Sequence, residues 1–186
     1  MNDDLERKLR ELIDRQEIWA VMVRYSRGID RLDREIVRSA YHDDATDDHQ
    51  MFVGTADAFI DWAFDLHGGA QVNTHHILTN HSCEIVGDDA YAETYYTYLG
   101  QNKEPPHLMS MGRYIDHLQR RDGVWRIFRR VCVIESGFDL TETNMQNIQE
   151  ASLSRTDPLP PATRDRGDVS YLRPPVSPWT GTAAKP

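Results

Sequence analysis

Four segments rich in β-branched and aromatic residues follow one another in the second half of the chain, and a turn signal separates each from the next. They run over residues 75–86, 90–101, 111–121 and 124–134. The last turn is Asp122-Gly123, which favours a two-residue hairpin because a type I′ turn needs positive φ at both central residues. The pattern predicts a four-stranded antiparallel meander.

Three helical patterns precede these strands. Apolar residues at three- to four-residue steps predict a long amphipathic helix over residues 4–26, which Gly28 loosens at its end. Asp33 and Thr55 are suited to cap two further helices, over residues 34–40 and 56–67. The expected apolar stripe of the first helix is Leu5, Leu9, Leu12, Ile13, Trp19 and Val23.

Residues 41–49 lie between the second and third helices and carry too much charge for a core strand, so a polar connection is expected here. Helices followed by an antiparallel sheet predict an α+β fold. We expect a cone-shaped α+β barrel, in which the N-terminal helices pack on one face of a curved sheet and enclose a pocket.

The predicted domain covers residues 1–140, and residues 141–186 form a C-terminal extension. After about residue 155 the extension is rich in proline and lacks apolar periodicity, so it cannot build a core of its own. Its apolar anchors favour an extended arm on its own domain or on a neighbouring subunit over a disordered tail. These anchors are Tyr171, Leu172, Val176 and Trp179.

Composition excludes several classes of function. The chain has 21 Lys and Arg against 30 Asp and Glu, and its net charge of −9 disfavours nucleic-acid and membrane surfaces as partners. The acidic N-terminus lacks the apolar core of a signal peptide, so a cytoplasmic location is expected. Cys83 and Cys132 lack CxxC spacing and are interpreted as buried thiols rather than zinc ligands or a disulfide.

Asp30 is the first candidate site residue. It follows Trp19 by eleven residues, so it shares the face of Trp19 if the helix extends that far. A carboxylate on that face would be buried and would need a partner. If the helix ends near Gly28, Asp30 is instead a solvated or capping residue, and the pattern leaves both alternatives open.

His75 and His76 open the first predicted strand, where adjacent residues point to opposite faces. Only one of them can face the helices, and the pattern does not choose between them; either one can also be a surface residue. An imidazole that meets a carboxylate inside the cone would act as a general base, because the carboxylate fixes its tautomer and stabilises its charged form. Such a pair removes a proton without a metal or a cofactor.

Other polar and aromatic residues could complete a site. Phenols at Tyr25, Tyr96, Tyr98 and Tyr114 could donate hydrogen bonds to a substrate, or could simply belong to the core. His49 and Trp62 are further candidates for substrate contact. The run Asp47-Asp48-His49 lacks the ligand spacing of a metal site, so no metal is predicted. The arginines near residues 120–130 are expected on a solvated sheet face.

Four parts of the sequence resemble the SnoaL-like family within the nuclear-transport-factor-2-like superfamily of α+β cones, over about residues 8–138. They are RYSRGIDRLD (24–33), YHDDATDDHQMFVGTADAFIDWA (41–63), THHILTN with AYAETY (74–80 and 90–95) and GRYIDHLQRRDGVWRIFRRV (112–131). Members include scytalone dehydratase, bile-acid 7α-dehydratase and hexachlorocyclohexane dehydrochlorinase, which use an Asp–His pair for cofactor-free elimination. Polyketide cyclases, isomerases and non-catalytic β-subunits of ring-hydroxylating dioxygenases also belong to it.

The resemblance assigns roles to particular residues. It implies that Asp30 and His76 form the pair and that Tyr25 assists, whereas the second histidine of scytalone dehydratase has no secure match. The implied function is a cofactor-independent lyase, a dehydratase acting on a small cyclic or apolar substrate. An isomerase or cyclase with the same pair, or a binding module without chemistry, are the alternatives. The resemblance also implies a homo-oligomer formed through the sheet, a trimer rather than a dimer.

Overall fold

The computed structural model describes residues 3–141 and 163–174. Its helices are α1 (Asp3–Arg31), α2 (Arg34–Arg38) and α3 (Ala56–Ala70). Its strands are β1 (Tyr41–Asp48), β2 (Val53–Thr55), β3 (Gln71–Val86), β4 (Asp89–Asn102), β5 (His107–Arg121) and β6 (Val124–Leu140). A short 3-10 helix, η1 (Val169–Tyr171), lies in the C-terminal segment.

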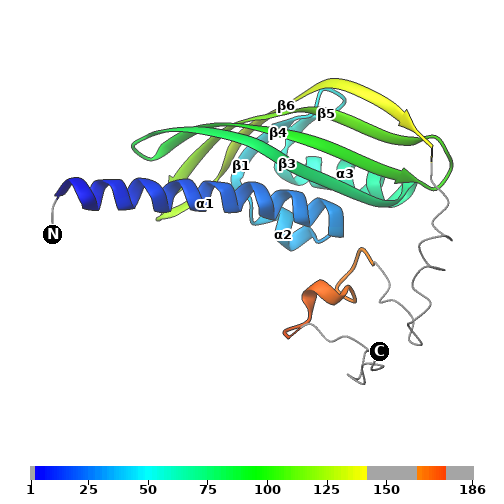
Figure 1. Ribbon diagram of the computed structural model, residues 1–186, viewed down its shortest axis with the longest axis horizontal. Coiled ribbons are helices and arrows are strands. Elements are labelled where there is room, and N and C mark those ends of the chain that lie inside the picture. Colours follow the sequence, from blue (N-terminus) through cyan, green and yellow to red (C-terminus); the bar gives the residue numbers. More distant parts are fainter. Residues whose placement is uncertain (1–2, 142–162, 175–186) are drawn as a thin grey trace, which may run out of the picture.

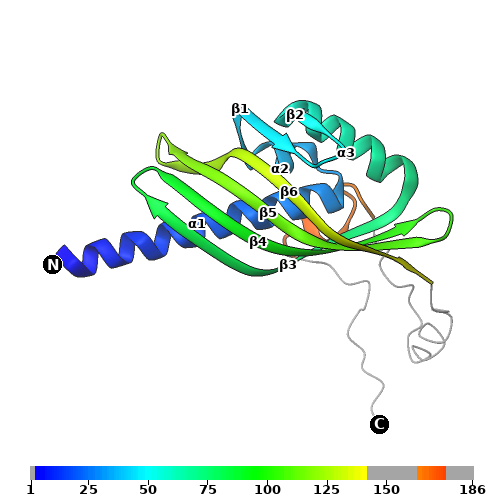
Figure 2. The same cartoon turned by 90° about the horizontal axis from the view of Figure 1, so that it is seen from above.

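The six strands form one curved, open sheet in the order β2-β1-β6-β5-β4-β3. Strands β3 to β6 make the predicted antiparallel meander, whereas β1 runs parallel to β6. The sheet arches over α1 and α3 (Figure 1), and the view from above places α2 and α3 beside β1 and β2 (Figure 2). Asp122 and Gly123 have φ of 53° and 77°, as the predicted hairpin requires. The α+β cone is confirmed.

The expectation of a polar connection over residues 41–49 is wrong, because most of it forms β1. The charges of β1 differ in burial: Asp43 and Asp44 are exposed, whereas Asp47 is buried. A buried carboxylate is tolerated because the Tyr41 hydroxyl donates to Asp47 Oδ2 over 2.6 Å. The ladder with β6 satisfies the backbone, and this long-range pairing leaves no local signal.

Helix α1 continues through Gly28 to Arg31 instead of ending near the glycine. A Cβ on Gly28 would lie 2.5 Å from Val37 Cγ2, so only glycine lets α2 pack this close. The extra turn carries Asp30 to the sheet. Asp33 and Thr55 cap α2 and α3 as predicted, since the side chain of each accepts from a backbone N–H in the first turn.

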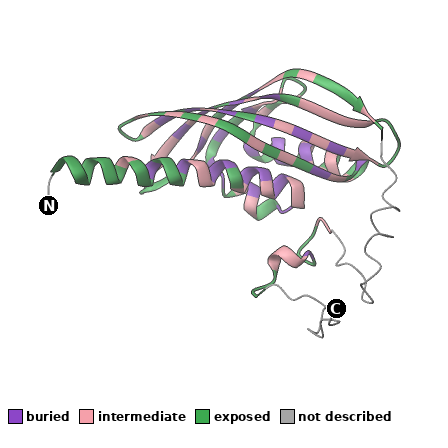
Figure 3. Ribbon diagram, viewed as in Figure 1, coloured by how far each residue is buried: buried purple, intermediate pink, exposed green. Residues whose placement is uncertain are grey.

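The buried stripe of α1 differs from the expected one. Ile18, Met22, Tyr25 and Ile29 are buried at the sheet, whereas the first turns of α1 extend beyond it and are largely exposed (Figure 1, Figure 3). The exposed apolar residues of this projecting part are Leu5, Leu9, Leu12 and Ile13. No helix in the described ranges is both long and apolar enough to cross a bilayer.

Residues 163–174 lie against the C-terminal end of α1 and against α2. Arg31 Nη1 donates to the Thr163 carbonyl over 2.9 Å, and the Tyr171 hydroxyl donates to Asp33 Oδ2 over 2.8 Å. Tyr171 is therefore an anchor as predicted, whereas Leu172 is exposed. The other two expected anchors, at positions 176 and 179, lie outside the described residues.

Candidate active site

Asp30 and His76 meet where the last turn of α1 crosses the start of β3. The His76 ring donates from Nδ1 to Asp30 Oδ1 over 2.7 Å, and its backbone N–H donates to Oδ2 over 2.9 Å. Thr74 Oγ1 also donates to Oδ1, over 2.9 Å. Burial opposes the charge of Asp30, but these hydrogen bonds outweigh it and hold the pKa of the carboxyl below its usual value.

The register of β3 decides between the two neighbouring histidines. His76 pairs with Tyr98 of β4, whose side chain is buried, while His75 points to the opposite face and is exposed. Because Asp30 accepts the Nδ1 proton, Nε2 of His76 is the ring's basic nitrogen. That atom has no hydrogen-bonding partner among the described residues. We call Asp30 and His76 the first pair.

Aromatic rings surround the His76 imidazole. The centroids of Tyr98, His67 and Tyr25 lie 4.9, 5.9 and 6.5 Å from that of His76. His67 donates from Nδ1 to Gln71 Oε1 over 2.7 Å, and the Tyr98 hydroxyl donates to the same oxygen over 2.7 Å. Burial lowers the pKa of His67 to about 4, and the nearby His76 adds to this effect, so His67 stays neutral.

His67 was assigned no role from the sequence, although the helical period could have indicated one. It follows Ile60 and Ala63 at three- to four-residue steps, and both of these are buried on the inner face of α3. This face carries His67 to the first pair, and α3 itself continues to Ala70 instead of stopping at the two glycines.

A second Asp–His contact lies at the end of β1. His49 Nδ1 donates to Asp47 Oδ1, and its Nε2 lies 3.3 Å from the Tyr25 hydroxyl. Phe59 stacks on the His49 ring at 4.4 Å between centroids. Burial opposes a charge on His49, but Asp47 outweighs it and raises the pKa of His49 to about 9. We call Asp47 and His49 the second pair.

The interior also contains a buried ion pair. Arg130 donates to both oxygens of Asp116, over 2.7 and 2.8 Å, and both side chains are fully buried. Its guanidinium lies 4.0 Å from the ring of Tyr25 and 4.2 Å from that of Tyr114. The expectation of a solvated position is therefore wrong for Arg130. Side chains along a strand point alternately to the two faces of the sheet, and that of Arg130 points to the inner face.

The remaining predicted substrate contacts all face the interior. Tyr96 stacks on Tyr114 at 4.6 Å between centroids, and burial raises the pKa of both phenols. The Trp62 ring stacks on that of Phe52 at 5.5 Å between centroids, and its centroid lies 6.5 Å from that of His49. Trp62 therefore lies beside the second pair. Tyr98 lies beside the first pair, and Tyr25 lies beside both pairs.

One residue of the C-terminal segment reaches the first pair. Arg164 Nε donates to the Asp30 carbonyl over 3.1 Å, Nη1 donates to the His67 carbonyl over 2.8 Å, and Nη2 donates to Thr74 Oγ1 over 3.4 Å. Arg164 thus connects the C-terminal ends of α1 and α3, whose carbonyls attract a cation. Nothing in the local sequence around Arg164 indicates this contact.

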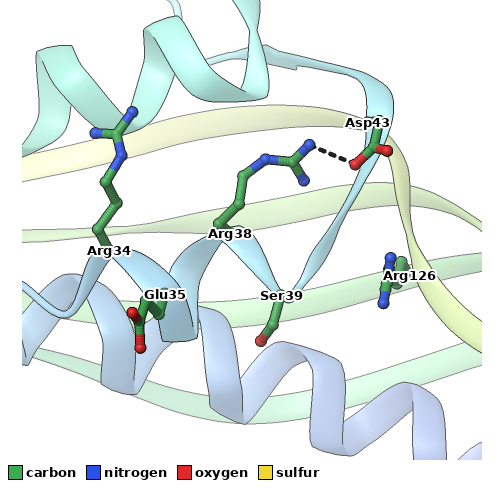
Figure 4. Close-up of a pocket in the computed structure, with 6 residues that line it drawn as sticks. All are labelled: Arg34, Glu35, Arg38, Ser39, Asp43 and Arg126. Atoms are coloured by element: carbon green, nitrogen blue, oxygen red, sulfur yellow. Dashed lines mark hydrogen bonds and ion pairs between the residues drawn. The ribbon is translucent and has the colours of Figure 1, made fainter.

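No group of three or more His, Cys, Asp or Glu side chains in residues 3–141 and 163–174 is arranged to hold a metal ion. An open cleft of about 470 Å³ lies on the outside, between α2 and β1 (Figure 4). Two of its three arginines are paired, since Arg38 pairs with Asp43 at 2.7 Å and Arg34 with Asp61 at 2.5 Å, whereas Arg126 makes no ion pair among the described residues. The candidate active site is therefore the interior around the two Asp–His pairs.

The structure is an α+β cone with an Asp–His contact between its first helix and the sheet. The sequence matches the SnoaL-like domain over residues 10–131, and the chain belongs to this family. A search among curated proteins finds no significant match.

Solved structures show the same fold. Hexachlorocyclohexane dehydrochlorinase LinA-type3 from Novosphingobium barchaimii LL02 is 20% identical, with a TM-score of 0.67 over 73% of this chain and 96% of that one. A candidate scytalone dehydratase from Novosphingobium aromaticivorans DSM 12444 is 22% identical, with a TM-score of 0.65 over 72% and 91%. A candidate aromatic ring hydroxylase from Novosphingobium aromaticivorans is 20% identical, with a TM-score of 0.62 over 73% and 96%.

Proposed function

We propose that the protein is a cofactor-independent lyase that eliminates water from a small, cyclic, largely uncharged substrate. The observation that carries this proposal is the geometry of the first pair. Asp30 accepts three hydrogen bonds from His76 and Thr74, and Nε2 of His76 is left without a partner among the described residues. The dehydratase and dehydrochlorinase names among the similar structures agree with elimination.

In this mechanism His76 Nε2 removes a proton from a carbon atom of the substrate. Asp30 holds the imidazole in the required tautomer and stabilises the imidazolium that forms. The electron pair of the C–H bond becomes the new C=C bond as the C–O bond on the neighbouring carbon breaks. Tyr25, whose pKa is raised well above its usual value by burial, remains a protonated phenol and assists the leaving group.

The surroundings of the pair support an uncharged ring as the substrate. Aromatic rings surround His76, and the one buried guanidinium among the described residues, Arg130, already has Asp116 as partner. A charged substrate would lose its hydration without gaining a free counter-ion. An isomerase is the second candidate, because Tyr25 and Tyr98, whose rings lie beside His76, carry phenols that could equally stabilise an enolate.

The test uses 3-hydroxycyclohexanone in D₂O, with elimination followed by the absorbance of the enone and proton removal by deuterium at the α-carbon. His76→Ala should lower the rate by about 10²–10⁴-fold, the usual contribution of positioned proton transfer. His75→Ala is the matched control, since His75 is the exposed neighbour on the opposite face. Near-normal turnover by His76→Ala, or no reaction with wild type, would contradict the proposal. Deuterium uptake without loss of mass would favour isomerisation.

We further propose that the outer face of the sheet forms a homo-oligomer, a trimer rather than a dimer. Its support is a set of exposed apolar side chains on neighbouring strands: Ile77, Tyr91, Tyr95, Met111, Ile115 and Val131. Ile115→Lys should reduce the mass measured by light scattering. Leu12→Lys, on the projecting part of α1, is the control, and dissociation by this variant alone would overturn the proposal.

A further inference from the structure

The interior holds two Asp–His pairs that share one phenol. Tyr25 lies between them: its hydroxyl is 3.3 Å from His49 Nε2, and its ring faces His76 edge-on with 6.5 Å between centroids. The mechanism above uses the first pair as the base and leaves the source of the leaving group's proton open.

We propose that His49 supplies the proton for the leaving group, through the hydroxyl of Tyr25. This inference rests on the proposed elimination and identifies the source of the proton that the leaving group receives. His49 is a positioning residue and proton reservoir in this scheme, because Tyr25, and not His49, would contact the substrate.

The geometry holds the His49 ring in a single orientation. Asp47 has a fully buried side chain; one of its oxygens accepts from His49 Nδ1 and the other accepts from the Tyr41 hydroxyl over 2.6 Å. Phe59 stacks on one side of the imidazole. With Nδ1 occupied by Asp47, Nε2 lies 3.3 Å from the Tyr25 hydroxyl, so a proton on Nε2 points at the phenol oxygen; the Cys132 thiol is a further side-chain partner of the ring. The hydroxyl hydrogen of Tyr25 is then free to point elsewhere.

Electrostatics favours the charged ring. The titratable and charged groups around His49 come from four elements and are Tyr25 on α1, Asp47 on β1, Tyr114 and Asp116 on β5, and Arg130 and Cys132 on β6. Arg130 and Asp116 neutralise each other through two hydrogen bonds. Asp47 is then the carboxylate left to be balanced, and an imidazolium beside it makes the second pair neutral overall. The pKa of His49, raised to about 9, agrees with this charge state.

The complete step conserves protons and electrons. His76 Nε2 takes the carbon-bound proton, the C–H electrons form the C=C bond, and the C–O electrons leave with the oxygen. Tyr25 gives its hydroxyl proton to that oxygen, which departs as water, and receives the Nε2 proton of His49. The cycle ends with His76 charged and His49 neutral, and exchange with solvent returns both to their starting states.

The first experiment needs no substrate. In protein labelled with ¹⁵N-histidine, the His49 ring should remain protonated at neutral pH and titrate near pH 9. Asp47→Asn should move this midpoint toward the ordinary value of about 6.5. Asp48→Asn is the matched control, because Asp48 hydrogen-bonds the backbone of Gln50 and not the ring. A His49 ring that titrates near or below 6.5 in wild type would overturn the inference.

The second experiment compares leaving groups. A good leaving group needs no proton, so His49→Gln should lower turnover of 3-hydroxycyclohexanone by about 10²-fold or more and leave 3-chlorocyclohexanone within a few-fold of wild type. Equal losses on both compounds would overturn the role of His49. His76→Ala should lower both, and its failure to do so would contradict the proposed function itself. Near-UV circular dichroism of both variants checks that each retains the native packing.

Discussion

The two Asp–His pairs contain the same residue types and differ in how they are built. Asp30 and His76 are 46 residues apart and are joined by packing of α1 against β3, whereas Asp47 and His49 are separated by only two positions at the end of β1. The side chain of Asp30 is 14% exposed and that of Asp47 is fully buried. The first carboxylate receives backbone and threonine donors, and the second receives a phenol.

This difference shows how one pair of residue types can serve two chemical tasks. The His76 ring contributes most to holding the pKa of Asp30 down, and the His76 backbone N–H and the Thr74 hydroxyl add to it, so the charge of this carboxylate is shared among three donors. Asp47 lies among side chains without a free cation and draws a proton onto His49. We infer a base in the first pair and an acid in the second.

The largest effect is expected where the first pair is broken. Asp30→Asn keeps the size of the side chain but removes the charge that holds the His76 tautomer, so turnover of 3-hydroxycyclohexanone should fall by about 10²–10⁴-fold. Nitrogen NMR of His76 should show a mixed tautomer. The same NMR spectrum and rate as wild type would mean that Asp30 does not orient the ring.

His49, in the second pair, and His67, beside the first pair, should make the free energy of unfolding depend on pH in opposite directions. The folded pKa of His49, about 9, lies above its unfolded value, so its contribution is complete below about pH 6.5 and is lost as the pH rises toward 9. The folded pKa of His67, about 4, lies below its unfolded value, so its contribution is lost as the pH falls from about 6.5 toward 4.

Thermal unfolding across this pH range tests both signs. His49→Gln should flatten the alkaline decline of the melting temperature, and His67→Gln should flatten the acidic decline. Each variant should leave the opposite limb unchanged, and a variant that alters both limbs equally would show that the two histidines do not titrate independently.

A smaller effect is expected from the C-terminal segment. Arg164→Ala removes donors to the carbonyls of Asp30 and His67 but touches nothing in the second pair. Turnover of 3-hydroxycyclohexanone and of 3-chlorocyclohexanone should therefore fall equally, by a few-fold, while the pH midpoint of the His49 titration is unchanged. Arg166→Ala is the control, since Arg166 is 63% exposed and pairs with Asp33 and Glu35. A change confined to 3-hydroxycyclohexanone would contradict this assignment.

The smallest effects are expected from the outward neighbours of the two pairs. His75→Ala and Asp48→Asn should both change turnover by less than two-fold, because His75 is exposed and the Asp48 side chain accepts from the backbone of Gln50 and not from the His49 ring. A large loss from either variant, measured with 3-hydroxycyclohexanone, would place the active site elsewhere on the chain.

Local signals account for what could be predicted from the sequence. The Asp-Gly hairpin, the caps at Asp33 and Thr55, and the four-strand meander each depend on residues close together in the chain, and all were confirmed. The predictions for β1 and Arg130 were wrong, because parallel pairing with β6 and the buried carboxylate of Asp116 are both distant in sequence.

The sequence by itself determined the α+β class, because turn preferences and side-chain periodicity act over a few residues, and its motifs indicated the family and the candidate pair of Asp30 and His76. The strand pattern did not choose between His75 and His76, the family resemblance named His76, and the tertiary structure shows its contact with Asp30. Only the tertiary structure brought His67 and Arg164 to the same place. The physical reason is that a buried carboxylate takes its partners from whatever elements pack around it, and the last turn of α1, permitted by Gly28, sets where that packing occurs.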